Sequence, residues 1–254
     1  MKIIAFTFAY NAEETIGKCI ENAKEQGLDV VVIDNGCTDN TIEIAKKLGA
    51  SIFEHKTEIF SVYEMIAWTI PQIRKVDCDW YVHKDTDEIF ETYDGKKVIE
   101  VVNKADSLGY NCMRFDMYEF WPTVDDDLTI KDFTKRIQYY SYYNSHYLKM
   151  VKNSSEIHLS NPHKASGECR ESPQRLVMRH YKFINLEQGR RKVRERFKRW
   201  GKTNFSSSAH PQYNQFTNES KYYVLEKDVY SKLYKFDGTW IKEKVFDGWR
   251  GYKK

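Results

Sequence analysis

Two carboxylates separated by one residue, Asp85 and Asp87, carry the strongest chemical signal in the sequence. In an extended segment alternate side chains share a face, so both carboxylates point the same way while Thr86 points away. Two such groups can hold Mg²⁺ or Mn²⁺ and leave coordination positions for a substrate diphosphate. Acidic triplets are also common on protein surfaces, so the triplet gains meaning only from the elements that position it.

Those elements are apolar runs that alternate with segments of helical periodicity, which is the pattern of a doubly wound α/β sheet. Expected strands cover residues 2–9, 30–33, 51–54 and 80–83, and expected helices run from Ile16 to a stop at Gly27, from a cap at Thr38 or Asp39 to Gly49, and over 61–75. Asp34 ends one of these strands, and Asp85 follows another. Open α/β sheets bind ligands just beyond the carboxyl ends of their strands, so both carboxylate clusters are expected at one crevice.

The pattern is less regular after residue 110. We expect a strand over 111–120, a Tyr-rich β-hairpin over 136–152, a strand over 174–181, a strongly basic helix over 186–200 and a polar loop over 204–220. The tail contains Tyr222, Tyr223, Tyr230, Tyr234 and Trp240, and it is too aromatic to be disordered. It is expected to pack back onto the domain.

The net charge of +3 hides a strong asymmetry. Residues 1–130 hold 13 Lys and Arg against 25 Asp and Glu, whereas residues 131–254 hold 27 against 12. An acidic half suits divalent cations and a basic half suits phosphates or anionic surfaces, although the two halves could also pair their charges with each other.

The cysteines and the hydropathy pattern bear on the compartment. Five cysteines at scattered positions contain no pair of metal-ligand spacing, which favours a reducing cytoplasm. No run approaches the roughly 20 apolar residues that span a bilayer, so a soluble or peripheral protein is expected.

Three motifs, in order, resemble glycosyltransferase family 2. They are Thr7-Phe8-Ala9-Tyr10-Asn11-Ala12-Glu13-Glu14-Thr15-Ile16, Val32-Ile33-Asp34-Asn35-Gly36-Cys37-Thr38-Asp39-Asn40-Thr41, and His83-Lys84-Asp85-Thr86-Asp87-Glu88. The resemblance is strong over residues 1–95 and patchy afterwards. Ala12 departs from the pattern, since many members carry Glu there.

The resemblance implies a GT-A type open α/β sheet, with a Rossmann-like nucleotide-binding half and a mixed α+β acceptor-side region. The implied division is a nucleotide-sugar-binding half at 1–110, an acceptor-side half with the basic helix at 111–203, and an appendage packed on the domain at 204–254. The implied nucleotide-sugar-binding residues are Phe8, Tyr10, Asn11, Glu13, Asp34, Asn35, Asp85, Lys192 and Arg196. Asp34 would contact the base or ribose, and Asp85 and Asp87 would ligate a Mn²⁺ or Mg²⁺ that bridges the diphosphate.

A C-terminal signature seen in a subset of the family is similar to the stretch from Arg179 through His180 to Arg196. It implies that His180 completes the metal shell, and the alternative is a half-buried histidine that holds a strand end. The basic run from Arg190 to Arg199 has three alternatives, namely a solvated helix face, phosphate binding, or adhesion to an anionic membrane.

An inverting transfer needs a general base for the acceptor hydroxyl. Asp116 and Glu119 are the first candidates, with Glu168 and Glu171 further along the chain, and the alternative is that they are surface or salt-bridged carboxylates. Glu119 is preferred because Phe120-Trp121-Pro122 could form an aromatic wall for a sugar ring.

These observations predict a metal-dependent glycosyltransferase of polysaccharide biosynthesis. It would move a sugar from a nucleotide-sugar donor, foremost a UDP-sugar, to a glycan, lipopolysaccharide, glycolipid or lipid-linked saccharide. A cytoplasmic location, with peripheral contact at the inner face of an anionic membrane, is expected, and nucleic acid is not. The alternatives are a non-catalytic nucleotide- or carbohydrate-binding module and a sugar nucleotidyltransferase, whose Gly-rich loop is missing here.

Overall fold

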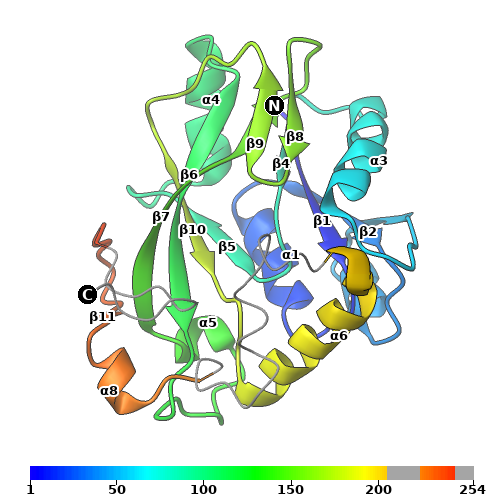
Figure 1. Cartoon of the computed structure of the whole chain (residues 1–254). Coiled ribbons are helices and arrows are strands. Elements are labelled where there is room, and N and C mark those ends of the chain that lie inside the picture. Colours follow the sequence, from blue (N-terminus) through cyan, green and yellow to red (C-terminus); the bar gives the residue numbers. More distant parts are fainter. Residues whose placement is uncertain (205–223, 244–254) are drawn as a thin grey trace. The chain divides into compact units, whose positions relative to one another are not determined.

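The structure, a computed structural model, describes the backbone of residues 1–204 and 224–243. The polar loop expected at 204–220 lies, beyond Asn204, outside these residues, as do Tyr222 and Tyr223. The chain divides into two compact units, and Figure 1 labels helices and strands of both. Unit 1 comprises Met1–Asp116 and Ser145–Arg179, and unit 2 comprises Met117–Asn144 and His180–Lys254.

Unit 1 contains the α/β part of the chain. Its elements are β1 (Ile3–Ala9), α1 (Ile16–Glu25), β2 (Asp29–Asp34), α2 (Thr41–Lys47), β3 (Ser51–Glu54), α3 (Val62–Lys75), β4 (Trp80–His83), β5 (Glu88–Glu91), α4 (Val98–Ser107), β8 (Ile157–Asn161) and β9 (Lys164–Gly167). The strands β6 (Cys112–Trp121), β7 (Tyr139–Lys152) and β10 (Leu176–His180) each have residues in both units. Unit 2 adds α5 (Phe133–Arg136), α6 (Leu186–Asn204), α8 (Lys227–Tyr230) and β11 (Tyr234–Lys235).

Among the described residues, nine strands form a mixed open sheet in the order β3-β2-β1-β4-β7-β6-β10-β5, with β11 beside β7. The strands β3, β2, β1 and β4 are parallel, and β7 runs antiparallel to β4. Parallel strands buried on both faces need near-continuous apolar runs, and Val30 to Ile33 supplies one. The expected α/β class and the first four expected strands are therefore confirmed.

The core of unit 1 forms where α3 and the β8–β9 hairpin pack on the sheet. Phe6, Ile33, Met65, Tyr81 and Val151 are among its buried members. Helix α1 packs against β2 and β5. In unit 2 a smaller core joins Trp121, Leu225, Tyr230 and Leu233.

Two local expectations are wrong. Residues 139–152 form one strand, β7, rather than a hairpin, because Asn144-Ser145 lacks the glycine that a two-residue hairpin turn favours. The N-cap of α2 is Asn40 rather than Thr38 or Asp39, although the Asp39 carboxylate still accepts a hydrogen bond from the Thr41 amide at 3.0 Å.

Cys112 and Cys169 form a disulfide within unit 1, with a Cα–Cα distance of 6.4 Å. The pairing was not foreseen, since 57 residues separate the two cysteines and spacing alone does not reveal it. In the part of the chain that is described, no helix is both long and apolar enough to cross a membrane.

Gly27, at the end of α1, lies where α1 and α4 approach each other closely. Its φ is +83°, and a Cβ there would lie 2.5 Å from Cγ2 of Ile99. We expect Gly27→Ala to destabilise the protein by about 2–4 kcal/mol, because it combines backbone strain with a steric clash. Gly95 is the matched control, since its φ is +73° but nothing lies within 4 Å of its Cβ position. Urea unfolding should show a clearly smaller decrease in the free energy of unfolding for Gly95→Ala. Equal decreases for the two variants would mean that the steric clash at Gly27 does not contribute to the destabilisation.

Candidate functional site

The candidate site lies at the carboxyl ends of the parallel strands of unit 1. β1 pairs with β2 up to Ala9 opposite Asp34, and with β4 up to Phe6 opposite His83. Asp34 and the acidic segment that follows β4 therefore emerge at the same edge of the sheet, on either side of β1. The crevice at this edge is the usual ligand position of an open α/β sheet.

Asp34 is held rigidly at this edge. Its Oδ1 accepts hydrogen bonds from the backbone amides of Gly36 at 3.0 Å and Cys37 at 2.8 Å, and its Oδ2 lies 3.9 Å from Nζ of Lys56. The turn that aims these amides needs a left-handed residue, which Gly36 provides with φ of +93°. One carboxylate oxygen is thus fixed by the backbone, while the other faces a cation that is more than half exposed.

The loop after β1 is locked to the loop after β2. Asn11 adopts φ of +46°, and its Oδ1 accepts a hydrogen bond from the Thr38 amide at 2.8 Å. The Glu13 carboxylate accepts hydrogen bonds from the backbone amide of Asn40 at 3.1 Å and from its side chain at 2.9 Å. These bonds give Asn11 and Glu13 a positioning role, and direct contact of either with a nucleotide-sugar stays a prediction.

Three more residues expected to bind the nucleotide-sugar lie near this edge. The Asn35 side chain is buried and donates to the His55 carbonyl at 2.6 Å and to Oγ1 of Thr57 at 3.0 Å, so it supports the loop after β3. Phe8 is half-buried, with its ring centroid 5.0 Å from that of His83. Tyr10, directly after β1, is also half-buried.

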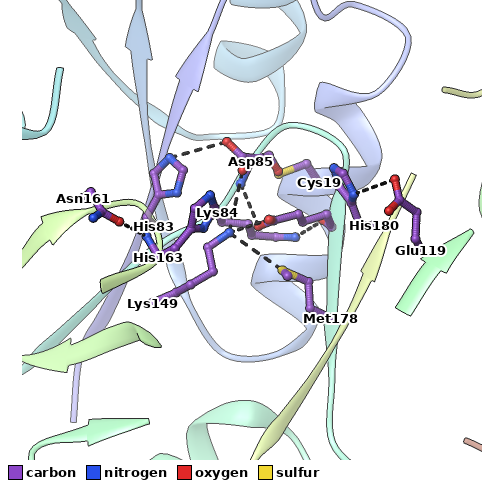
Figure 2. A network of polar contacts seen from close by, with 11 residues as sticks. Cys19, His83, Lys84, Asp85, Glu119, Lys149, Asn161, His163, Met178 and His180 are labelled. Atoms are coloured by element: carbon purple, nitrogen blue, oxygen red, sulfur yellow. Dashed lines mark hydrogen bonds and ion pairs between the residues drawn. The ribbon is translucent and has the colours of Figure 1, made fainter. Parts of the chain in front are cut away.

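The acidic motif, Asp85-Thr86-Asp87-Glu88, begins after β4 and ends at the first residue of β5. Figure 2 shows Asp85 and the polar side chains around it. The Asp85 side chain is 40% exposed, whereas Asp87 and Glu88 are buried. Glu88 Oε2 accepts a hydrogen bond from the Asp85 amide at 2.9 Å, which closes the turn. The carboxylate of Asp85 lies between two basic side chains, with His83 Nε2 3.5 Å from Oδ1 and Lys149 Nζ 3.7 Å from Oδ2.

Buried titratable groups surround the motif. Burial lowers the pKa of His83 to about 4, so its ring is neutral at physiological pH. Burial also lowers the pKa of Lys84, whose amine donates to the Glu88 carbonyl and lies 4.4 Å from the centroid of the Phe90 ring. On α1, the thiol of Cys19 donates to the Asp85 carbonyl at 3.3 Å, and burial raises its pKa to about 11. The motif is therefore a desolvated site in which charges interact strongly.

The donor set of the motif fits a hard divalent cation. Asp85 and Asp87 supply carboxylate oxygens, and the exposure of Asp85 gives access from solvent. Among the described residues, no group of three or more His, Cys, Asp or Glu side chains converges as a metal cage. Two carboxylates completed by diphosphate and water oxygens need no such cage, since Mg²⁺ is commonly bound by one or two carboxylates plus substrate phosphates.

Asp116 is the last residue of the first segment of unit 1, and neighbouring side chains bind both of its carboxylate oxygens. It is 1% exposed, with Oδ1 2.8 Å from NH1 of Arg175 and Oδ2 2.6 Å from the Tyr93 hydroxyl. Both oxygens thus accept hydrogen bonds from neighbouring side chains. This arrangement suits a carboxylate that positions Arg175 and Tyr93 better than one that removes a proton.

Glu119 and His180 are brought together within unit 2. His180 Nδ1 lies 3.6 Å from Glu119 Oε1, with side-chain exposures of 19% and 6% (Figure 2). The sequence motifs indicate different roles for these two residues and carry no signal of the pair. Phe120 and Trp121 are 0% and 1% exposed, so the expected aromatic wall for a sugar ring is wrong, because both rings are core residues.

The basic helix α6 also belongs to unit 2. The amine of Lys192 donates to the Lys182 carbonyl at 2.9 Å, and Arg196 is half-buried. Arg190, Arg194 and Lys198 are exposed and recur every fourth residue, so they follow one face of the helix. A pocket open to solvent at the start of this face is lined by Leu186, Glu187, Arg190 and Arg194. Arg190, Arg194 and Lys198 all belong to the basic run predicted from Arg190 to Arg199, whereas Lys192 and Arg196, the two residues expected at the diphosphate, are half-buried.

Comparison with known proteins identifies the family. The sequence model described as Glycosyl transferase family 2 matches residues 5–148, which is more than half of the chain. The chain therefore belongs to glycosyl transferase family 2. Together with the observed open sheet, this membership confirms the GT-A type fold class.

Individual relatives are distant. An uncharacterized protein of Methanocaldococcus jannaschii is 44% identical over 48 residues, which cover 18% of this chain and 20% of that protein. Similar solved structures include S. aureus TarS, with TM-score 0.36 and 15% identity over 50% of this chain and 37% of TarS.

Two further solved structures contain ligands. One is glucosyl-3-phosphoglycerate synthase from Mycobacterium tuberculosis with Mn²⁺, UDP and glucosyl-3-phosphoglycerate, with TM-score 0.34 and 20% identity over 46% of this chain and 44% of that chain. The other is the mannosyltransferase PcManGT from Pyrobaculum calidifontis with GDP-Man and Mn²⁺, with TM-score 0.34 and 16% identity over 48% of this chain and 35% of that chain. The matched parts span less than half of each of these relatives, so the assignment rests on the family model.

Proposed function

We propose that the protein is a divalent-metal-dependent, inverting glycosyltransferase that uses a nucleotide-sugar donor, foremost a UDP-sugar. The observation that carries this proposal is the position of Asp34 and of the acidic motif at the same edge of the sheet, on either side of β1. The Asp34 carboxylate can accept a hydrogen bond from a base or ribose, and the carboxylates of Asp85 and Asp87 can bind a cation beside a diphosphate.

In this proposal the residues of unit 1 hold the donor. The Oδ2 of Asp34 accepts a hydrogen bond from the base or ribose, with Tyr10 and Phe8 beside the base, while Asn11, Glu13 and Asn35 keep the loops in place. Asp85 and Asp87 would hold Mn²⁺ or Mg²⁺, which as a Lewis acid neutralises the charge of the leaving diphosphate. For unit 2 the family resemblance implies that Lys192 and Arg196 bind the diphosphate and that His180 binds the metal, and these roles are proposed on that resemblance alone. Glu119 is proposed as the base that the inverting transfer implied by the resemblance needs.

The acceptor is proposed to be a glycan, lipopolysaccharide or lipid-linked saccharide, in keeping with polysaccharide biosynthesis. The exposed stripe of Arg190, Arg194 and Lys198 supports peripheral contact with an anionic membrane, because each basic residue near such a surface contributes about 1 kcal/mol. A cytoplasmic site at the inner face of the membrane is part of the proposal. The Cys112–Cys169 disulfide argues against it, since disulfides persist mainly in oxidising compartments.

Hydrolysis of UDP-, dTDP-, GDP- and CMP-sugars, with and without Mn²⁺, tests the proposal, because many transferases slowly transfer to water. We expect one donor to be consumed only when metal is present. If no donor is consumed, calorimetric titration of the corresponding nucleotides decides the matter. Metal-dependent binding of one nucleotide would support the proposal and point to a missing acceptor, whereas no binding with or without metal would contradict it.

A further inference from the structure

Lys149, on β7, is a fully buried cation one residue beyond the segment that the family model matches. Its amine forms an ion pair with Oε1 of Glu88, lies 3.7 Å from Oδ2 of Asp85 and lies 3.8 Å from Sδ of Met178 (Figure 2). An amine with no solvent contact needs a counter-charge, and Glu88 provides it at 2% exposure.

Both carboxylate oxygens of Glu88 therefore have partners within the protein. Oε1 binds Lys149, and Oε2 accepts a hydrogen bond from the Asp85 amide at 2.9 Å. The third carboxylate of the acidic motif is therefore not placed to act as a metal ligand. It neutralises the lysine and at the same time fixes the backbone from which the Asp85 side chain extends.

Asp85 is the only other described carboxylate in contact with Lys149. A lysine amine and a divalent cation would compete for the same Asp85 oxygen, because each is a positive charge that attracts it. At 3.7 Å the lysine amine is not seated on Oδ2, since its closer partner is Glu88. His83 does not change this balance, because its ring is neutral.

We propose that Lys149 and Glu88 form a buried positioning pair in which Glu88 holds the lysine amine away from the Asp85 carboxylate and so leaves that carboxylate available to a divalent cation. This inference rests on the proposed metal-dependent function. Lys149 touches neither donor nor acceptor in this role, so it is a positioning residue rather than a catalytic one.

The pair predicts an unusual relation between two substitutions. Glu88→Gln keeps the hydrogen bond to the Asp85 amide but releases Lys149, which should then move onto Asp85 and weaken Mn²⁺ binding about ten- to a hundredfold. Adding Lys149→Met to Glu88→Gln removes the competing cation and should restore most of the binding. The double variant should also fold, because replacing both members of a buried ion pair is often nearly neutral, unlike removing one.

Binding of Mn²⁺, followed by the electron paramagnetic resonance signal of the unbound ion with and without UDP, tests this relation, and urea unfolding reports stability. The control double variant is Lys152→Met with Asp106→Asn, which removes a 2.7 Å ion pair of unit 1 outside the acidic motif and should leave Mn²⁺ binding unchanged. A merely structural pair would let Lys149→Met restore stability without restoring Mn²⁺ binding, and that result would overturn the inference. Unchanged Mn²⁺ binding in Glu88→Gln would also overturn it. If the wild-type protein binds no Mn²⁺ in either condition, both the inference and the proposed metal dependence fail.

Discussion

Asp87→Ala is expected to lower kcat/KM for donor turnover by about 10³-fold, corresponding to about 4 kcal/mol of transition-state stabilisation. Asp87 is buried in the segment between β4 and β5, and its charge interacts with the buried amine of Lys84, so the loss of this carboxylate leaves less negative charge to hold a divalent cation. A leaving diphosphate would then depart without its counter-charge being held in place. Steady-state kinetics across a range of Mn²⁺ concentrations measure the loss.

Burial makes a folding defect the competing explanation, so the design includes Asp87→Asn, which keeps the shape and removes the charge. Asp94→Ala is the control for the loss of an aspartate, because that side chain is 39% exposed and pairs with Lys96 on the surface. We expect Asp87→Asn to unfold at nearly the wild-type urea concentration and yet to lose most turnover. Full turnover in a folded Asp87→Asn protein would show that Asp87 is not a metal ligand.

The fold of the first 90 residues was predictable because each element carries its own local signal. The run from Val30 to Ile33 is apolar throughout, and Ile16, Cys19, Ile20 and Ala23 recur at helical spacing and are all buried. β7 could not be predicted in the same way, because its 14 residues mix tyrosines with polar and aliphatic residues in a pattern that also suits a hairpin. Its position in the middle of the sheet is set by pairing with β4, which no local pattern records.

The residues of the candidate site differ in the same way, since a local sequence pattern predicts some of them and not others. Asp34, Asp85 and Asp87 were predictable because each lies at the end of a strand with a clear apolar pattern. Lys149 and Arg175 were not, because they reach the site by contacts with residues 61 and 59 positions away, Glu88 and Asp116. A lone lysine within a polar strand has no sequence signal that distinguishes a buried ion pair from a solvated side chain.

The second large effect is expected at the proposed general base. Glu119→Gln should lower kcat for transfer by about 10²–10⁴-fold, the range that a positioned proton acceptor contributes, while leaving the affinity for the donor nucleotide unchanged. The reason is chemical, because an amide retains the shape of the side chain but cannot take a proton from the acceptor hydroxyl. Transfer kinetics combined with calorimetric titration of the nucleotide separate these two quantities.

Asp116→Asn is the matched variant, because it changes the other carboxylate nominated on β6. Its oxygens already accept hydrogen bonds from Arg175 and Tyr93, so we expect lower stability with a much smaller change in kcat. The reverse pattern, with Glu119→Gln fully active and a folded Asp116→Asn variant inactive, would assign the base to Asp116. Glu119 would then serve only as the charged partner of His180, whose Nδ1 lies 3.6 Å from its carboxylate, because a carboxylate at that distance acts on the imidazole electrostatically whether or not it removes a proton.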